Sequence, residues 1–210
     1  MFCIEQFFPQ WRTLSIHESS PVLGRGANLR LTKEAPAYVV SYYYAGVAPG
    51  KIVDGIRCEN LEQLTFDNES FDLHVTQDVF EHLFDPAAAF REITRTLRPG
   101  GAHVFTTPLV RKNEPTQFRA ALAPDGTVIH LAEPPEYHGN PISSEGSLVT
   151  VNWGYDITNF IFETSGLFTE ILFLDVLECG IRAEYIEAPI ARKFPRKNSR
   201  ELKPPPSLQQ

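Results

Sequence analysis

The predicted fold is decided by residues 71–108, which read FDLHVTQDVFEHLFDPAAAFREITRTLRPGGAHVFTTP. Residues 72–76 predict a buried strand, residues 85–98 a capped helix, and residues 102–108 a second strand. Pro99-Gly100-Gly101 separates this helix from the second strand and predicts the end of the helix. Such a strand–helix–strand unit needs a right-handed crossover, which places the carboxyl ends of both strands at one edge of a parallel sheet.

The helix of this unit carries clear signals at its start and along its buried face. Asp85 is a good N-cap, and Pro86 occupies the first helical position, where a missing N–H costs nothing. Phe90, Ile93 and Leu97 follow at intervals of three and four residues, which predicts one apolar face against the sheet.

Further elements extend from this unit in both directions. We predict strands at residues 11–16 and 38–44, helices at 1–10 and 26–34, and a short extended segment at 58–66. Asp156 predicts the start of a helix that runs through Phe162 and stops at Gly166, and residues 168–176 and 183–191 predict two closing strands. Residues 1–193 therefore form a single predicted domain, and the proline-rich segment 194–210 is predicted to be disordered.

Residues 109–153 have no long helical period and many turn formers. Asp125-Gly126 within them predicts a β-hairpin. A loop-rich insert of this length in a compact domain is usually functional, so we expect a lid on the substrate side.

Composition limits the class of protein. The chain has 210 residues, a net charge of -7 and 42% apolar residues, which is typical of one globular domain and unfavourable for binding a nucleic-acid backbone. Its three cysteines have no paired spacing, so we expect neither a disulfide framework nor a zinc site, and a cytoplasmic setting. No segment predicts a signal peptide or a membrane span, so no membrane partner is expected.

The motifs FDLHVTQDVFEH and FREITRTLRPGG resemble the fourth-strand and fifth-strand region of class I S-adenosylmethionine (SAM)-dependent methyltransferases, of the methyltransferase type 11-like kind. The resemblance implies an α/β fold, a Rossmann-like three-layer sandwich with a mostly parallel seven-stranded sheet and an antiparallel last strand. It also implies SAM as cofactor, bound across the carboxyl ends of the strands.

The first half of the implied cofactor site departs from the family pattern. The first turn, His17–Pro21, contains no glycine, and Glu18 supplies its only acidic group. The resemblance assigns Glu18 to the SAM amino group, although a helix-cap or surface role is an equal alternative. At the end of the second strand Ser41 stands where an acid normally holds the ribose.

The second half of the implied site matches better. Glu59, Asn60 and Leu61 resemble the family's adenine contact, with a polar group for the exocyclic amine and Leu61 against the ring. Thr76, Gln77 and Asp78 follow the fourth strand, where cofactor and substrate meet, and Asp78 is a candidate catalytic residue. The alternative for these three is an ordinary polar loop.

Three histidines of the sequence differ in their predicted roles. His74 lies within a strand and is predicted to be packed in the core. Glu81 and His82 belong to the family's EH signature, but neighbouring residues on a helical turn do not face each other, so a structural role for one is expected. His138 in the insert is the candidate catalytic base, since histidine is the usual general base at neutral pH, with a lid-loop histidine bonded to backbone as the alternative. Tyr137 is a further candidate for contact with the substrate. Trp153 and Tyr155 are candidates for the same opening, with a place in the core as an equal alternative.

The sequence therefore predicts a SAM-dependent methyltransferase that acts on a small-molecule or sugar-containing acceptor. The absence of a catalytic triad does not oppose this, because the sulfonium methyl is already activated and the protein mainly aligns the reactants. One alternative is a catalytically inactive methyltransferase-like domain that serves as a binding or scaffold protein. Another is a different nucleotide-binding Rossmann enzyme, weakened by the lack of a G-x-G-x-x-G after a strand.

Overall fold

The computed structural model of the chain describes residues 1–139 and 146–195. At its centre lies an eight-stranded sheet with the order β13-β14-β6-β5-β1-β2-β4-β3. The strands are β1 (Ile16–Ser19), β2 (Tyr38–Tyr42), β3 (Ile52–Val53), β4 (Ile56–Cys58), β5 (Phe71–Gln77), β6 (Leu97–Thr106), β13 (Phe168–Phe173) and β14 (Glu187–Arg192). The sheet is parallel from β6 through β4, whereas β14 runs antiparallel to both neighbours.

The predicted fold class is confirmed, including the antiparallel last strand. The sheet has one strand more than the predicted seven, because β3 pairs with β4 across a tight turn at Asp54-Gly55. Gly55 in this turn has a φ of 81°, which glycine adopts without steric cost.

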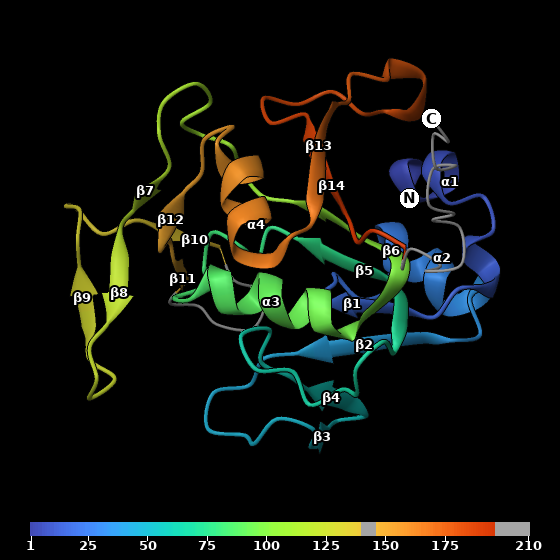
Figure 1. Ribbon diagram of the computed structural model, residues 1–210, viewed down its shortest axis with the longest axis horizontal. Coiled ribbons are helices and arrows are strands. Elements are labelled where there is room, and N and C mark those ends of the chain that lie inside the picture. Colours follow the sequence, from blue (N-terminus) through green and yellow to red (C-terminus); the bar gives the residue numbers. More distant parts are fainter. Residues whose placement is uncertain (140–145, 196–210) are drawn as a thin grey trace, which may run out of the picture.

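Helices cover both faces of the sheet, which makes three layers (Figure 1). On one face α1 (Phe2–Phe7) and α2 (Gly26–Glu34) pack their buried residues against β1, β5, β6 and β14. On the other face α3 (Pro86–Thr96) and α4 (Ile157–Ser165) lie side by side over a second core.

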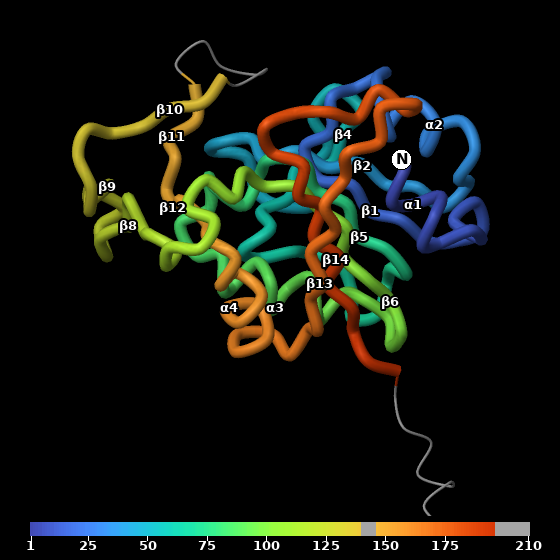
Figure 2. Tube along the Cα trace, turned by 90° about the horizontal axis from the view of Figure 1, so that it is seen from above, coloured from blue at the N-terminus to red at the C-terminus, as the bar shows by residue number. Residues whose placement is uncertain are grey.

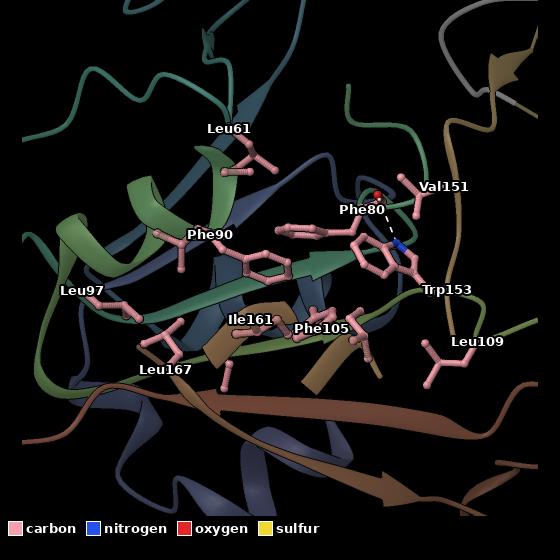
Figure 3. Packing of buried hydrophobic residues seen from close by; sticks show 14 of the residues in the cluster. Leu61, Phe80, Phe90, Leu97, Phe105, Leu109, Val151, Trp153, Ile161 and Leu167 are labelled. Atoms are coloured by element: carbon pink, nitrogen blue, oxygen red, sulfur yellow. Dashed lines mark hydrogen bonds between the residues drawn. The ribbon is translucent and has the colours of Figure 1, made fainter. Parts of the chain in front are cut away.

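The second core gathers around Phe80 and Phe90, whose rings stack at a centroid distance of 4.2 Å (Figure 3). Phe90 comes from α3, and the predicted cap of this helix is confirmed, because Oδ1 of Asp85 accepts a 2.8 Å hydrogen bond from the Ala88 N–H. Trp153 closes the core from the insert side and donates its indole N–H to the Phe80 carbonyl.

The prediction for the first strand was wrong in position. Residues 11–13 form a 3-10 helix, and β1 begins only at Ile16, so His17 and Glu18 belong to a strand and not to a turn. Both side chains are fully buried in β1, where polar groups of neighbouring strands are their partners. The turn after β1 therefore starts at Ser20, whose φ of 57° is the left-handed conformation that glycine usually supplies.

The insert forms small two-stranded sheets. They pair β7 (Gln117–Phe118) with β12 (Val151–Asn152), β8 (Ala120–Leu122) with β9 (Val128–His130), and β10 (Tyr137–His138) with β11 (Ser147–Leu148). The predicted hairpin at Asp125-Gly126 is confirmed by the pairing of β8 with β9. Figure 1 and Figure 2 show the insert beyond the carboxyl ends of β2 and β5, so it overhangs that edge of the sheet.

The predicted disordered tail lies outside the described residues from 196 onward. Among the helices of the described residues, none has the length and apolar character needed to cross a membrane.

Candidate functional site

A cavity of about 800 Å³ lies at the carboxyl edge of the parallel sheet. Its walls come from the ends of β1, β2 and β5, from the segments after β4 and β5, and from the insert. The chain leaves β1 toward β2 on one side and leaves β5 toward β6 on the other, so strand order reverses between β1 and β5. Ligands of open α/β sheets bind in the crevice at such a point.

Two of the predicted cofactor residues after the first strands do not reach this cavity with their side chains. The carboxylate of Glu18 accepts hydrogen bonds from the Tyr38 hydroxyl and, at 2.8 Å, from Nε2 of Gln77. Burial raises the pKa of Glu18, although these hydrogen bonds oppose the rise. Ser41 is fully buried and its hydroxyl lies 2.8 Å from Nε2 of His17. Because Glu18 is buried, its predicted alternative as a surface residue was wrong.

Ser19, Ser20 and Tyr43 line the cavity at this end instead. Sequence reasoning missed them because it placed the first turn too early and sought an acid after the second strand. Their position at the ends of β1 and β2 was the available signal.

The predicted adenine contacts lie together on the cavity wall. Glu59, Asn60 and Leu61 all line it. The Glu59 carboxylate is engaged in the interior, because it accepts hydrogen bonds from Nε of Arg57 at 2.5 Å and from the Thr65 N–H at 2.9 Å. The Asn60 side chain accepts from the Glu62 N–H and shapes the turn. Leu61 is 4% exposed and joins the second core.

The end of β5 contributes one side chain to the interior and two to the cavity. Thr76 is buried, and its hydroxyl lies 2.9 Å from Nε2 of His103. Gln77 and Asp78 line the cavity, and Gln77 also holds Glu18. Asp78 has a φ of 52°, and its Oδ1 accepts a hydrogen bond from the Thr106 hydroxyl. Its Oδ2 has no hydrogen-bond partner within residues 1–139 and 146–195, so one carboxylate oxygen remains available to a ligand.

Glu81 and His82 face each other more closely than predicted. The segment from Asp78 to Phe84 is a series of turns and not a helix, so the side chains of adjacent residues converge. Oε1 of Glu81 lies 3.9 Å from Nε2 of His82 and has no hydrogen-bond partner in the described part of the chain. Burial raises the pKa of Glu81 to about 7, since the charged form loses hydration there.

His82 and His138 meet where the insert contacts this segment. The His82 Nδ1 donates to the Leu148 carbonyl at 2.8 Å, which leaves Nε2 as an acceptor. The His138 ring lies 5.4 Å from the His82 ring, centroid to centroid, at an interplanar angle of 87°. His82 and Gly139 line the cavity, so the structure brings the neighbourhood of His138 to the same opening. Burial lowers the pKa of His82, which keeps the ring neutral.

The remaining aromatic candidates divide between core and surface. Trp153 is fully buried, and Tyr155 donates its hydroxyl proton to the Glu187 carboxylate at 3.0 Å. Tyr137 is 57% exposed. None of these three lines the cavity described above.

A ladder of buried histidines was only partly predicted. His17, His74 and His103 are aligned in register on β1, β5 and β6, and all three are fully buried. His17 and His74 approach at 2.9 Å between their Nδ1 atoms, and Nε2 of His74 lies 2.9 Å from the Thr96 hydroxyl. The prediction that His74 is a packed core histidine is confirmed.

Comparisons with known proteins agree with this geometry. The family model described as "Methyltransferase domain" matches residues 28–105. No curated protein matches the chain. Among solved structures, a SAM-dependent methyltransferase from Mesorhizobium loti superposes with a TM-score of 0.54 at 18% identity, covering 91% of this chain and 96% of that one.

Two further structures share the fold at low identity. A SAM-dependent methyltransferase from Methanosarcina mazei has a TM-score of 0.51 at 15% identity and covers 90% of this chain and 98% of its own. The [4+2]-cyclase SpnF also reaches 0.51, at 11% identity, covering 93% of this chain and 80% of that one. At such identities the structural likeness concerns the fold, and the family is indicated by the matched methyltransferase domain over the strand–helix–strand unit. Residues 28–105 thus match a methyltransferase domain, and the chain has the fold of these solved SAM-dependent methyltransferases.

Proposed function

We propose that this chain transfers a methyl group from SAM to a hydroxyl of a small-molecule or sugar-containing acceptor held under the insert. The observation that carries the proposal is the cavity at the β1/β5 switch point, lined on one side by strand ends and on the other by the insert. Its volume of about 800 Å³ lies toward the upper end of ligand pockets, which run from roughly 300 to 1,000 Å³.

The residues of the cavity fit SAM in chemistry. Ser19 and Ser20 offer hydroxyls and backbone at the end of β1, while Asn60 and Leu61 offer an amide and an apolar surface. The carboxylate oxygen of Asp78 that has no partner among the described residues is a suitable acceptor for the amino group of the methionine part. SAM supplies, when bound, a methyl group on a positively charged sulfur that is ready for direct displacement.

The chain's own residues position the acceptor and take up its proton. As the acceptor oxygen bonds to the methyl carbon and the sulfur–methyl bond breaks, the hydroxyl proton must leave to a base. In our proposal this proton goes to the Glu81–His82–His138 cluster, because the Nε2 atom of His82 is an acceptor and lies beside the cavity. His138, the base predicted from the sequence, belongs to that cluster.

Calorimetric titration of the whole chain with SAM and with its demethylated product tests the proposal. We expect binding of either compound, weakened about tenfold or more by Asp78→Asn, since a charge-assisted hydrogen bond is worth about 1.5–3 kcal/mol. Asp54→Asn is the matched control, because Asp54 is also exposed, has a φ of 50° and lies in a turn remote from the cavity lining. No binding at millimolar ligand would overturn the proposal.

A second candidate is an inactive domain of the same fold that binds a ligand or partner without SAM. It is favoured by the engagement of Glu18 and Ser41 in interior hydrogen bonds, which leaves no acid for the ribose at the end of β2. The same titration separates the two, because this candidate requires that SAM does not bind.

For the setting of the protein we propose the cytoplasm. Support comes from the cysteines, since Cys3, Cys58 and Cys179 are all free thiols, as a reducing compartment allows.

A further inference from the structure

We propose that Glu81, His82 and His138 bind a divalent transition-metal ion of the Zn²⁺ class at the rim of the cavity. Each residue offers one donor atom, and the three donor atoms lie within 4.8 Å of one another. Two imidazoles and one carboxylate are a common ligand set for catalytic zinc and for non-haem iron(II), and such sites keep open positions for water or substrate.

The carboxylate is the strongest observation for a ligand at this place. Glu81 is 2% exposed, and its Oε1 is buried without a hydrogen-bond partner in residues 1–139 and 146–195. Its other oxygen, Oε2, accepts a 3.0 Å hydrogen bond from the Thr107 hydroxyl, which holds the carboxylate in orientation. A buried carboxylate oxygen left unpaired is costly, and a cation beside it removes that cost.

The first imidazole is oriented as a metal ligand. His82 donates from Nδ1 to the Leu148 carbonyl, and metal-bound histidines usually donate their other ring N–H in this way. Its Nε2 therefore presents a lone pair, 3.9 Å from Oε1 of Glu81. Donor atoms that share one such ion lie about 3–4 Å apart, so small side-chain shifts close the site.

The second imidazole comes from the insert, whose backbone is tied to the same segment. The Glu81 carbonyl accepts hydrogen bonds from the N–H groups of Thr150, at 2.7 Å, and Val151, at 3.2 Å. His138 pairs with Ser147 in the β10–β11 ladder, next to Leu148, whose carbonyl orients His82. The ion would thus fasten the insert to the end of β5.

The position of the site suggests what its open coordination positions take. His82, Gly139 and Leu148 line the large cavity, so these positions face the ligand space and not the core. A hydroxyl or carboxylate oxygen of the acceptor fits such a position. With the ion bound, the Nε2 lone pair of His82 is occupied, and coordination, which would lower the pKa of an acceptor hydroxyl, replaces the base role of His82. This role rests on the proposed function, whereas metal binding itself does not.

The test titrates Zn²⁺ into the chelator-stripped full chain by calorimetry and repeats the titration with Co²⁺, whose visible absorption reports its ligands. We expect one ion per chain and visible Co²⁺ bands. His138→Ala should weaken binding by more than about 100-fold, since loss of a mere outer-shell partner already costs about 10–100-fold. His130→Ala is the control, because His130 is an exposed histidine on β9 of the same insert.

Glu81→Gln gives a second variant that keeps the size of the side chain, and thermal unfolding checks that it is folded. It should lose binding as His138→Ala does. Equal Zn²⁺ affinity of the wild type and His138→Ala, or no binding at millimolar Zn²⁺, would overturn the site. SAM titrated in the presence of chelator keeps the two proposals separate, because Zn²⁺ binding without SAM binding supports the metal site and contradicts the methyltransferase proposal.

Discussion

Two groups of histidines in this protein have the same side chain and opposite surroundings. His17, His74 and His103 lie inside the sheet, where hydroxyls of Ser41, Thr76 and Thr96 and aromatic rings surround them. His82 and His138 lie at the rim of the cavity beside a carboxylate oxygen that has no partner in the described residues. We call His17, His74 and His103 the histidine ladder, and Glu81, His82 and His138 the rim cluster.

The two groups differ in their hydrogen-bond partners and in whether they border the cavity. In the ladder every ring nitrogen except Nδ1 of His103 has a hydrogen-bond neighbour among the described residues, and burial lowers the pKa of His17 and His103 to about 3, so both stay neutral. In the rim cluster one buried acceptor is left over and the rings border a cavity. A buried group with complete hydrogen bonding stabilises the fold, whereas a buried acceptor without a partner beside a cavity is a candidate for ligand binding.

The largest expected effect is a fall in the free energy of unfolding at acid pH, caused by the buried histidines of the histidine ladder. The unfolded chain takes up protons on His17 and His103 below pH 6.5, but the folded chain does so only near pH 3, so stability falls as the pH falls. Between pH 7.5 and pH 5 these two residues together should lower the free energy of unfolding by about 4 kcal/mol. The charge of Arg57 near His17 acts in the same direction.

This loss is measured by urea unfolding of the double variant Glu18→Gln/Glu81→Gln. Both carboxyls have raised pKa values and would offset the histidines, so glutamine removes the opposing contribution. Equal stability of the double variant at both pH values would contradict neutral, buried histidines.

The second effect comes from the rim cluster and has the opposite sign. Burial raises the pKa of Glu81 in the folded chain to about 7. Its contribution to the free energy of unfolding is therefore fully present below pH 4.5 and is lost as the pH rises through 7. Glu18→Gln, which keeps Glu81, should therefore lose about 2 kcal/mol less than the double variant between pH 7.5 and pH 5. Parallel pH profiles of these two proteins would show that Glu81 is not desolvated.

A third prediction breaks one contact of the ladder. His103→Phe keeps the ring but leaves the buried Thr76 hydroxyl without its 2.9 Å partner, so we expect a loss of about 1–3 kcal/mol at pH 7.5. Chemical denaturation measures it. A neutral result would mean that another group or water takes over this hydrogen bond.

The smallest expected effect is that of the corresponding change at the rim. The side chain of His138 is 35% exposed, and His138→Ala should alter the free energy of unfolding by less than about 0.5 kcal/mol without metal. The same denaturation series compares it with His103→Phe. A large loss in the metal-free protein would assign His138 to the fold and remove the contrast between the two groups.

Much of the fold could be predicted because its signals are local. The Asp85 cap, the apolar spacing through Phe90 and Ile93, and the Asp125-Gly126 hairpin each depend on residues a few positions apart. β1 could not be placed in this way. His17 and Glu18 are typical of a turn by composition, and they enter a strand because partners on β2 and β5 satisfy them.

The residues of the candidate site likewise include some that could be predicted from the sequence and some that could not. Strand order was enough to bring Asn60, Leu61, Gln77 and Asp78 to one cavity, since parallel strands end at a common edge. It was not enough to find that Ser41 and Thr76 face inward, because a shift of one residue along a strand reverses the side of the sheet.

The sequence by itself determined the resemblance to a methyltransferase domain, the three-layer fold and the edge of the sheet at which the cavity lies, because these follow from local patterns and from the handedness of the crossover. Only the tertiary structure decided which polar groups are used up in the interior and which remain available. That choice depends on contacts between residues far apart in the chain, such as His82 with Leu148 and Glu18 with Gln77. No local pattern specifies such contacts.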